Sequence, residues 1–467
     1  MELIQLQANS QEPLYMQIYS YFKQTIEQSG LREGDKLPSI RGLSANLAVS
    51  KITVEKAYQQ LMSEGYISNC NRARYLVSKL ESLTFKRGTS RSQIPETELQ
   101  TMVKTEVRYD FASGGMDIDG FDFPLWKRYI SKVFSNKDRL VDYGHIQGEP
   151  ELRREIAKYI RESRGVNTLP EQIIIGPGVQ SLLNTLCSLL KTESSSIAFE
   201  DPGFKNGRRI FDNYAFEITA IPMKKDGMDI EKLFASKAKV VYVSPSHQFP
   251  TGYIMSVGKR VQLLNWAESV EGIIIEDDYD SELRYFGRPI PALKGLDNGE
   301  RVVYLGSLSK IIPPSIRISY MVLPEALLAV FQKNAAFYNQ AASTLEQLAL
   351  AQYMEDGCLE RQIRRLRKLY SGKKIILAEA VKEILGSQAE IENTESGLYI
   401  ILTIKSEQSS EQLVARALAK GCRVAAVQDY YLETTEENTS RILLYFSKIP
   451  AEEIVVAVSL LRDAWFE

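Results

Sequence analysis

The sequence predicts a small helical domain followed by a large α/β domain. A length of 467 residues exceeds what one hydrophobic core organises, which indicates two or three domains. Beyond Tyr109, apolar runs of strand length alternate with helical patterns, as is typical of a mostly parallel sheet with helices on both faces. Before residue 80, three amphipathic helical segments precede two short β-rich runs. The predicted fold class is therefore α/β with a separate N-terminal domain.

Composition indicates a soluble globular protein. Hydrophobic residues make up 44% of the chain and charged residues 25%. No apolar run approaches the roughly 18 residues of a membrane span, and Met1-Glu2-Leu3 does not begin like a signal peptide. The 4 cysteines form no CxxC pair, and 2 histidines are too few for most histidine-based metal sites. We expect a cytoplasmic protein that has no membrane contact and no bound metal.

Residues 1–80 are expected to form a winged helix-turn-helix. The apolar spacing of a first helix is carried by Leu14, Ile18, Phe22 and Ile26. Ser39 and Ser50 are placed to cap a second and a third helix. Gly65 ends the third helix, and residues 66–77 have the pattern of a β-hairpin. Three helices and a basic hairpin are the parts of a DNA-binding domain.

The placement of charge in this domain favours DNA binding more than its total does. Nine Lys or Arg and seven Asp or Glu give residues 1–80 a net charge of only +2. The second helix of a helix-turn-helix pair enters the major groove with its N-terminal residues toward the bases. The predicted DNA contacts are Arg41, Ser50, Lys51, Thr53, Lys56, Arg72 and Arg74. A three-helix bundle with a solvated charged face is the alternative.

The first domain resembles the GntR-type winged helix of bacterial repressors. The matching motifs are Leu37-Pro38-Ser39-Ile40-Arg41, Val49-Ser50-Lys51-Ile52-Thr53-Val54 and Glu64-Gly65-Tyr66-Ile67. The chain departs from that family at the wing, where Cys70-Asn71-Arg72-Ala73-Arg74 replaces the usual glycines. Residues 81–108 follow as a polar segment without apolar periodicity, and we expect a flexible linker there.

The large domain is expected to span residues 109–467. Its central strands are marked by Ile173–Ile175, Ser196–Phe199, Val240–Val243, Ile273–Ile275 and Val302–Leu305. From about residue 350 the pattern changes to a long basic helix, two strands and a final helix. We therefore expect a smaller α+β subdomain over about residues 350–467.

Polar residues follow the carboxyl ends of these strands, where open α/β sheets bind ligands. The residues at this edge are Gly178, Val179, Gln180, His247, Asp277, Tyr279, Ser307, Ser309, Lys310 and Arg317. A lysine for a Schiff base and a carboxylate for a pyridinium nitrogen are what pyridoxal phosphate (PLP) requires. Tyr279 is placed to reach the ring hydroxyl, and Phe204 to cover the ring face. The Gly178 turn with Ser307, Ser309 and Arg317 is suited to the phosphate.

Each of these residues taken alone has a simpler explanation. A lysine after a strand is commonly solvated, and Asp277 is also a helix-cap candidate. Phe204 fits a hydrophobic core, and His247 fits a hydrogen-bonding loop. Their shared position at the strand ends favours the cofactor.

The large domain resembles the fold-type I aminotransferases, and the whole chain resembles the MocR/GabR subfamily of GntR regulators. The motifs are Ser246-His247-Gln248-Phe249-Pro250-Thr251-Gly252, Glu276-Asp277-Asp278-Tyr279-Asp280 and Ser307-Leu308-Ser309-Lys310. The resemblance implies a PLP-dependent transferase fold with Lys310 as the Schiff-base lysine, Asp277 at the pyridinium nitrogen and Tyr279 at the ring hydroxyl. It also implies a homodimer in which each winged helix packs near the partner's large domain.

The resemblance also suggests effector contacts. Arg441 matches the arginine that holds a ligand carboxylate in aminotransferases and in the GABA-responsive member, although a surface salt bridge is an equal alternative. Asn206 stands where that member has a further arginine, while Lys205 and Arg208 lie nearby. This departure weakens a GABA assignment and leaves PLP itself, or another amine or amino acid, as the signal.

Three functions are compatible with this sequence. The first is a PLP-dependent transcriptional regulator, not an enzyme, that binds double-stranded promoter DNA and senses PLP or a PLP-reactive amine or amino acid at Lys310. It would control vitamin B6 synthesis or amino-acid or GABA-type metabolism. The alternative is an active aminotransferase with an accessory DNA-binding segment. The third is a regulator whose large domain is only a dimerisation scaffold.

Overall fold

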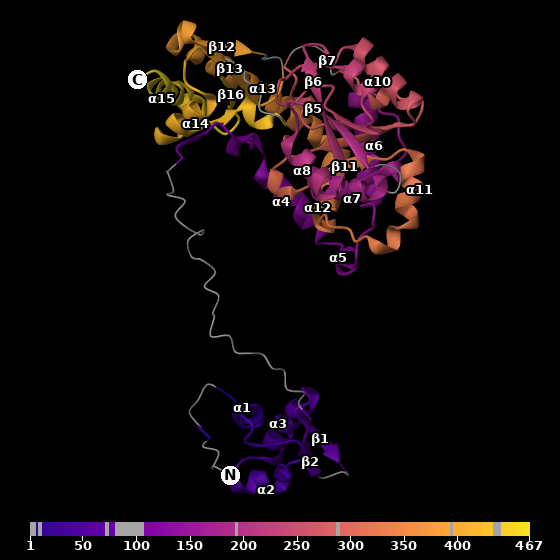
Figure 1. The fold of residues 1–467 in the computed structure, drawn as a ribbon, viewed down its shortest axis with the longest axis vertical. Helices are drawn as coiled ribbons and strands as arrows, with labels where there is room; N and C mark the ends of the chain where they lie inside the picture. The colour runs from indigo at the N-terminus through magenta and orange to yellow at the C-terminus, as the bar shows by residue number, and fades with distance from the viewer. Residues whose placement is uncertain are drawn as a thin grey trace. The chain divides into compact units, whose positions relative to one another are not determined.

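The chain folds into two compact units, Met1–Thr101 and Met102–Glu467 (Figure 1). The computed structural model describes residues 6–7, 12–70, 74–79, 107–191, 195–285, 290–392, 396–432 and 440–467, with Cys70 and Arg74 described by their backbone alone. Residues 81–106 of the predicted linker lie outside the described residues. No described helix combines the length and the apolar character that crossing a membrane requires.

The first unit is a winged helix-turn-helix, as predicted. Its elements are α1 (Leu14–Glu27), α2 (Ile40–Asn46), α3 (Lys51–Ser63), β1 (Ile67–Cys70) and β2 (Arg74–Val77), with β1 and β2 antiparallel. Ser39 Oγ accepts from the Gly42 N–H at 3.1 Å, and Ser50 Oγ accepts from the Thr53 N–H at 3.1 Å. These two caps start α2 and α3 where the sequence predicts, because each satisfies an N–H that lacks a helical partner. Fully buried side chains of α1 and α3, Phe22 and Tyr58 among them, form the core.

The second unit is built on a mixed eight-stranded sheet in the order β4-β11-β10-β9-β8-β5-β6-β7. Strands β10, β9, β8, β5 and β6 run parallel to one another, whereas β11 is antiparallel to both β10 and β4, and β7 is antiparallel to β6. The strands are β4 (Ile173–Gly176), β5 (Ser196–Asp201), β6 (Glu217–Lys224), β7 (Gly227–Met228), β8 (Val240–Val243), β9 (Ile273–Asp278), β10 (Val302–Ser307) and β11 (Ser319–Val322). The five predicted strands are β4, β5, β8, β9 and β10.

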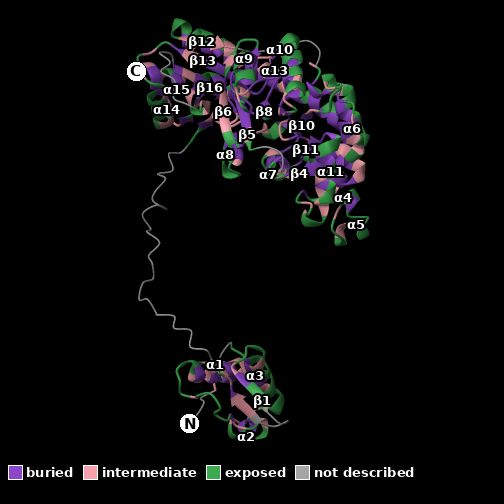
Figure 2. Cartoon of the chain, turned by 45° about the vertical axis from the view of Figure 1, so that its right-hand side comes forward, coloured by how far each residue is buried: buried purple, intermediate pink, exposed green. Residues whose placement is uncertain are grey.

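Helices cover both faces of this sheet, which is why β4, β8 and β11 are buried at every position (Figure 2). Residues of α7, α8 and α11 form one buried cluster with the sheet, and residues of α6, α9, α10 and α12 pack on the other side. The helices of this part are α4 (Phe123–Val133), α5 (Asp138–Val141), α6 (Pro150–Arg164), α7 (Val179–Leu190), α8 (Lys205–Asn213), α9 (Ile230–Ala235), α10 (Val257–Ser269), α11 (Glu325–Lys333) and α12 (Thr344–Glu355).

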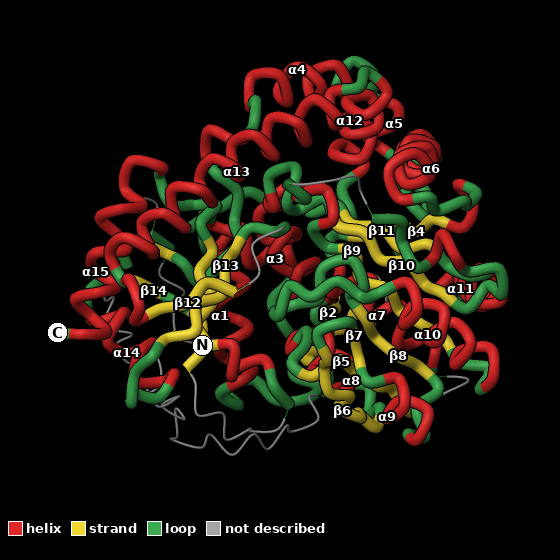
Figure 3. The backbone as a smooth tube through the Cα atoms, turned by 90° about the horizontal axis from the view of Figure 1, so that it is seen from above, coloured by secondary structure: helices red, strands yellow, loops and turns green. Residues whose placement is uncertain are grey.

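A smaller sheet in the order β12-β13-β16-β15 belongs to the C-terminal region (Figure 3). Its elements are α13 (Cys358–Ile384), β12 (Ala389–Glu392), β13 (Tyr399–Ile404), α14 (Ser410–Ala419), β14 (Cys422–Arg423), β15 (Ala425–Ala426), β16 (Ser440–Tyr445) and α15 (Ile454–Phe466). One face of this sheet packs against α13, α14 and α15, while Tyr399 and Leu443 lie on the other face. Strand β3 (Tyr109–Asp110) pairs with β14, so the first residues of the unit lie beside its C-terminal region. The sequence pattern does not predict this pairing.

Candidate cofactor site

A cavity of about 220 Å³ lies where the carboxyl ends of β9 and β10 meet the small sheet. Its lining residues are Val179, Phe204, Phe249, Asp277, Tyr279, Asp280, Ser307, Lys310, Leu398, Tyr399 and Tyr445. The structure thus brings together six of the predicted cofactor residues, from segments more than 130 positions apart. The position agrees with the rule that open α/β sheets bind ligands beyond their carboxyl ends.

Lys310 enters this cavity from the turn that follows β10. Its Nζ donates to the Gly114 carbonyl oxygen at 2.7 Å and lies 6.0 Å from the ring centre of Tyr445. Burial lowers the pKa of Lys310, and Lys448 acts in the same direction, whereas Asp280 opposes them. A lowered pKa increases the share of neutral amine at pH 7, which is the form that attacks a carbonyl carbon.

Asp277 lines the same cavity as Lys310. Tyr242 donates its hydroxyl to Asp277 Oδ2 at 2.5 Å, while the buried Oδ1 has no hydrogen-bond partner among the described residues. Burial raises the pKa of Asp277 to about 7, and the Tyr242 hydrogen bond acts against that rise. A buried, unpartnered carboxylate oxygen in a cavity wall is suited to a cationic N–H from a ligand.

Tyr279 and His247 belong to a cluster of stacked aromatic side chains at the cavity. Tyr279 lines the cavity, and its hydroxyl lies 3.1 Å from His247 Nδ1 and 3.4 Å from the Tyr399 hydroxyl. His247 is buried, its ring stacks on those of both Tyr279 and Tyr399, and its Nδ1 is 2.9 Å from both carboxylate oxygens of Asp280. His247 is not among the described lining residues, and its contact with the Tyr279 hydroxyl ties it to the site.

A cradle suited to an anion lies at the start of α7. Gly178 has a φ of 125°, and a Cβ at this position would lie 2.3 Å from an Arg317 guanidinium nitrogen. Arg317 therefore lies against Gly178, next to the start of α7, where the first N–H groups have no helical partner. Nearby, Ser307 Oγ lies 3.1 Å from Ser309 Oγ.

Phe204 also lines the cavity. Its ring stacks on that of Tyr242, with centres 6.0 Å apart and an interplanar angle of 27°. Tyr242 thereby holds both Phe204 and Asp277. The sequence analysis did not identify Tyr242, because it lies 35 positions before Asp277 and has no characteristic spacing from it.

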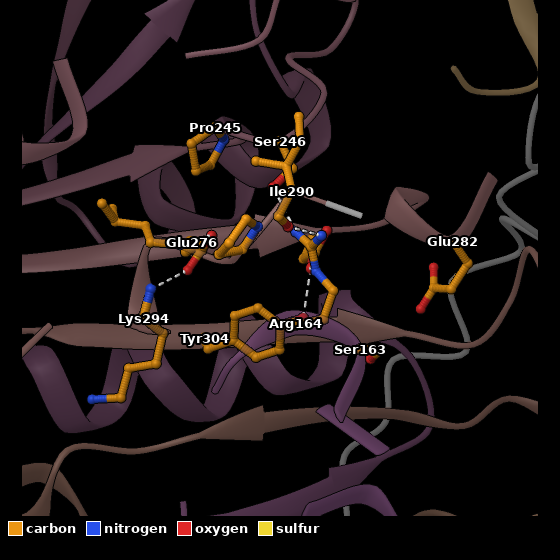
Figure 4. A network of polar contacts seen from close by, with 12 residues as sticks. Ser163, Arg164, Pro245, Ser246, Glu276, Glu282, Ile290, Lys294 and Tyr304 are labelled. Carbon is orange, nitrogen blue, oxygen red and sulfur yellow. Dashed lines mark hydrogen bonds and ion pairs between the residues drawn. The ribbon is translucent and has the colours of Figure 1, made fainter. Parts of the chain in front are cut away.

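A buried polar network on the other face of β9 fixes the strand (Figure 4). Arg164 Nε donates to Asp278 Oδ2 at 2.7 Å, and a second nitrogen of Arg164 donates to Ser246 Oγ at 2.6 Å. Tyr304 donates to Asp278 Oδ2 at 2.5 Å. Because side chains alternate along a strand, this network holds Asp278 on one face and leaves Asp277 on the cavity side. Arg164 was also not identified from the sequence.

The three predicted effector residues lie outside the described cavity lining. Arg441 forms a two-pronged ion pair with Glu392, at 3.1 Å to Nε and 2.6 Å to a terminal nitrogen. Buried Arg208 pairs with Asp201 at 2.9 Å and also donates to the Tyr430 carbonyl oxygen. Lys205 is exposed at the start of α8.

The predicted DNA contacts differ in exposure and in whether the structure describes their side chains. Arg41, Lys51 and Lys56 are exposed on α2 and α3. Ser50 caps α3, and its hydroxyl lies 2.7 Å from the Thr53 hydroxyl. Arg72 lies outside the described residues, and Arg74 is known only as the first backbone position of β2.

The chain joins a winged helix-turn-helix to an α/β domain whose cavity holds both a lysine and a carboxylate. These features define a class of DNA-binding protein that carries its own ligand site. Residues 14–77 match the family described as bacterial regulatory proteins, gntR family, and residues 109–459 match aminotransferase class I and II. The chain belongs to the MocR/GabR subfamily of GntR-type transcriptional regulators, in which these two domains are fused.

Two regulators match nearly the whole chain, and a solved aminotransferase matches most of it. The uncharacterized HTH-type transcriptional regulator YdeL of Bacillus subtilis is 38% identical over 455 residues, which cover 97% of each chain. The pyridoxine biosynthesis transcriptional regulator PdxR of Corynebacterium glutamicum is 29% identical, over 92% of each chain. A kynurenine aminotransferase from Pyrococcus horikoshii, solved in complex with PMP, has a TM-score of 0.70 and 26% identity, over 81% of this chain and 97% of the other.

Pyridoxal phosphate is the cofactor of this domain, and the residues of the cavity fit it. The unpartnered Asp277 Oδ1 suits the protonated ring nitrogen, and the Gly178 cradle with Arg317 suits a phosphate. Lys310 supplies the amine in the same cavity as Asp277.

Proposed function

We propose that this transcriptional regulator senses PLP, or an amine that reacts with PLP, at Lys310, and that the outcome alters how a homodimer binds promoter DNA. The observation that carries the proposal is the Lys310 side chain, whose pKa is lowered by burial in a cavity that also holds Asp277. A winged helix-turn-helix on the same chain favours a regulatory use of that cavity.

Within the proposal, each end of the cofactor has its own partners. Asp277 holds the ring nitrogen, Tyr279 the ring hydroxyl, and Phe204 covers one face. The phosphate is held by Arg317 together with the residues Gly178, Val179, Gln180, Ser307 and Ser309. PLP supplies an aldehyde that condenses reversibly with primary amines.

The chain's own residues prepare that chemistry. Tyr242 donates to Asp277 and so favours its ionised form, which keeps a proton on the ring nitrogen. Burial favours the neutral amine of Lys310, and the Gly114 carbonyl oxygen orients it. An effector amine that took the place of Lys310 at the aldehyde carbon would release the Lys310 side chain as a free amine in the cavity. This local change is the proposed signal.

Relatives indicate the two candidate pathways. One relative is named for pyridoxine biosynthesis, another as a probable rhizopine catabolism regulatory protein. We accordingly propose control of vitamin B6 synthesis, or of amine or amino-acid metabolism, by this chain. The effector contacts expected from the sequence are Arg441, Lys205 and Arg208, of which Arg441 and Arg208 already pair with carboxylates of the protein. The proposed DNA contacts are Arg41, Ser50, Lys51, Thr53, Lys56, Arg72 and Arg74.

The test combines a footprint with a chemical trap. The PLP-loaded protein is expected to protect a site upstream of its own or a neighbouring gene. Borohydride reduction followed by peptide mass spectrometry is expected to find the cofactor fixed to Lys310. Absence of any protected site, or attachment at another lysine, contradicts the proposal.

A second function, that of a working aminotransferase, is favoured by the presence of Lys310 and Asp277 in one cavity. Full turnover of an amino acid with a 2-oxo acid at about 1 s⁻¹ or faster would support it. Half-reactions alone are compatible with a sensor.

A further inference from the structure

Arg441 faces the cavity side of the small sheet. In the register of β13 and β16, Tyr399 lies opposite Tyr445, and Thr403 lies opposite Arg441. Side chains two or four positions apart on a strand share a face. Tyr399 and Tyr445 line the cavity, so Arg441 shares their face, about 13 Å along the strand from Tyr445. Arg441 is not among the described lining residues, so it would meet a ligand that extends from the cavity along this face rather than the amine at Lys310.

Glu392 already forms an ion pair with this guanidinium. Its two carboxylate oxygens accept from Arg441 at 3.1 and 2.6 Å, and the Thr403 hydroxyl donates to one of them. The side chains of Arg441 and Glu392 are only 14% and 26% exposed. This two-pronged geometry is the one an arginine offers to a ligand carboxylate. The protein therefore supplies its own carboxylate to the position that a ligand would need.

The other cations near the cavity have different partners: Arg317 lies against Gly178 in the phosphate cradle, and Lys448 donates to Ser113 Oγ at 2.9 Å and pairs with Asp110 at 3.6 Å. Lys310 is the one cationic side chain among the described lining residues, and its amine is committed to the cofactor in the proposed function. Arg208 is paired with Asp201. The rest of the wall is largely aromatic, with Phe249, Tyr399 and Tyr445 on the side of the small sheet. A ligand carboxylate would have to displace Glu392 and leave a second carboxylate in a half-buried position, which is unfavourable.

We propose that Glu392 is a specificity-determining residue that closes Arg441 to ligand carboxylates, so that the effector is a primary amine with an aromatic or aliphatic body and no carboxylate. This inference rests on the proposed function, because it takes the cavity beside Lys310 as the effector site. It differs from the expectation that Arg441 binds an amino-acid effector. The aromatic wall supplies the apolar contact that such an amine requires.

The first test uses ligands without an amine. Calorimetry on the full-length, PLP-loaded protein compares 3-phenylpropanoate with 3-phenylpropanamide, which differ in charge but hardly in shape. The wild type is expected to bind the carboxylate no more tightly than the amide. Glu392→Gln is expected to bind the carboxylate at least about tenfold more tightly than the wild type does, because Arg441 is released. Glu390→Gln, at an exposed position of the same strand, is the matched control and is expected to behave as the wild type.

The second test uses the wild type alone, so it does not depend on how a variant folds. Phenethylamine is expected to change the cofactor absorbance at a concentration about tenfold or more below that of L-phenylalanine. A wild type that prefers the carboxylate in either pair, or a folded Glu392→Gln variant without the gain, overturns the inference. If neither amine changes the absorbance, the amine-sensing part of the proposed function loses its support and PLP itself remains the proposed signal, whereas the two ligands without an amine still decide the role of Glu392.

Discussion

Replacing Tyr242 by phenylalanine removes the hydroxyl that donates to Asp277 Oδ2 at 2.5 Å. Asp277 is buried, and burial already raises its pKa to about 7 despite this hydrogen bond. A hydrogen bond to a charged group contributes about 1.5–3 kcal/mol. Without it, less of Asp277 is ionised at pH 7, and the ring nitrogen of the cofactor loses its partner. We expect the dissociation constant for PLP to rise about 10- to 100-fold at pH 7.

The assay is a PLP titration of cofactor-free protein, followed by absorbance or by quenching of tryptophan fluorescence, at several values between pH 6 and 9. The defect of Tyr242→Phe is expected to shrink toward pH 9, because Asp277 ionises there without help. Tyr304→Phe is the matched control, since it removes an equally short bond to Asp278 on the other face of β9. Unchanged PLP affinity in Tyr242→Phe, or an equal and pH-independent loss in both variants, would refute the assigned role of Asp277.

Three further predictions concern the cofactor phosphate, the buried Asp277 carboxyl and DNA binding. Arg317→Ala is expected to weaken PLP binding about 10- to 100-fold while leaving pyridoxal, which has no phosphate, nearly unaffected; equal losses for both ligands would contradict this. Burial raises the pKa of Asp277 from 3.8 to about 7, so its contribution to the stability of the cofactor-free protein is lost as pH rises from about 4 through 7. The melting temperature of Asp277→Asn minus that of the wild type should therefore increase between pH 5.5 and 8.5. A difference that stays constant over this range would contradict the prediction. Lys51→Ala is expected to weaken DNA binding and to reduce the salt slope by about one, whereas an unchanged slope would remove Lys51 from the phosphate contacts.

The sequence was sufficient for the elements whose signals are local. Ser39 and Ser50 predict the starts of α2 and α3 because an N-cap depends on its own next three residues. Apolar runs predict the central strands because a sheet covered on both faces excludes polar side chains. Asp277 and Lys310 follow two of those runs, and parallel neighbouring strands bring such residues to one edge.

Contacts between distant segments left no local signal. Tyr242 meets Asp277, and Glu392 meets Arg441, through pairings set by the sheets rather than by sequence spacing. The effector prediction for Arg441 rests on a matching position alone. The equal alternative, a salt bridge, names no partner, and in the structure Arg441 pairs with Glu392. The pairing of β3 with β14 was missed for the same reason, since a two-residue strand carries no periodicity.

The central claim is that chemistry at Lys310 reports to the DNA-binding domain. The most direct measurement is the affinity and footprint of the full-length protein on its upstream DNA, with PLP and with an added amine, for the wild type and Lys310→Ala. The account predicts that both proteins bind the DNA and that the amine changes the footprint or affinity of the wild type alone. An identical response in Lys310→Ala, or no response in the wild type to PLP or to any amine, would contradict it.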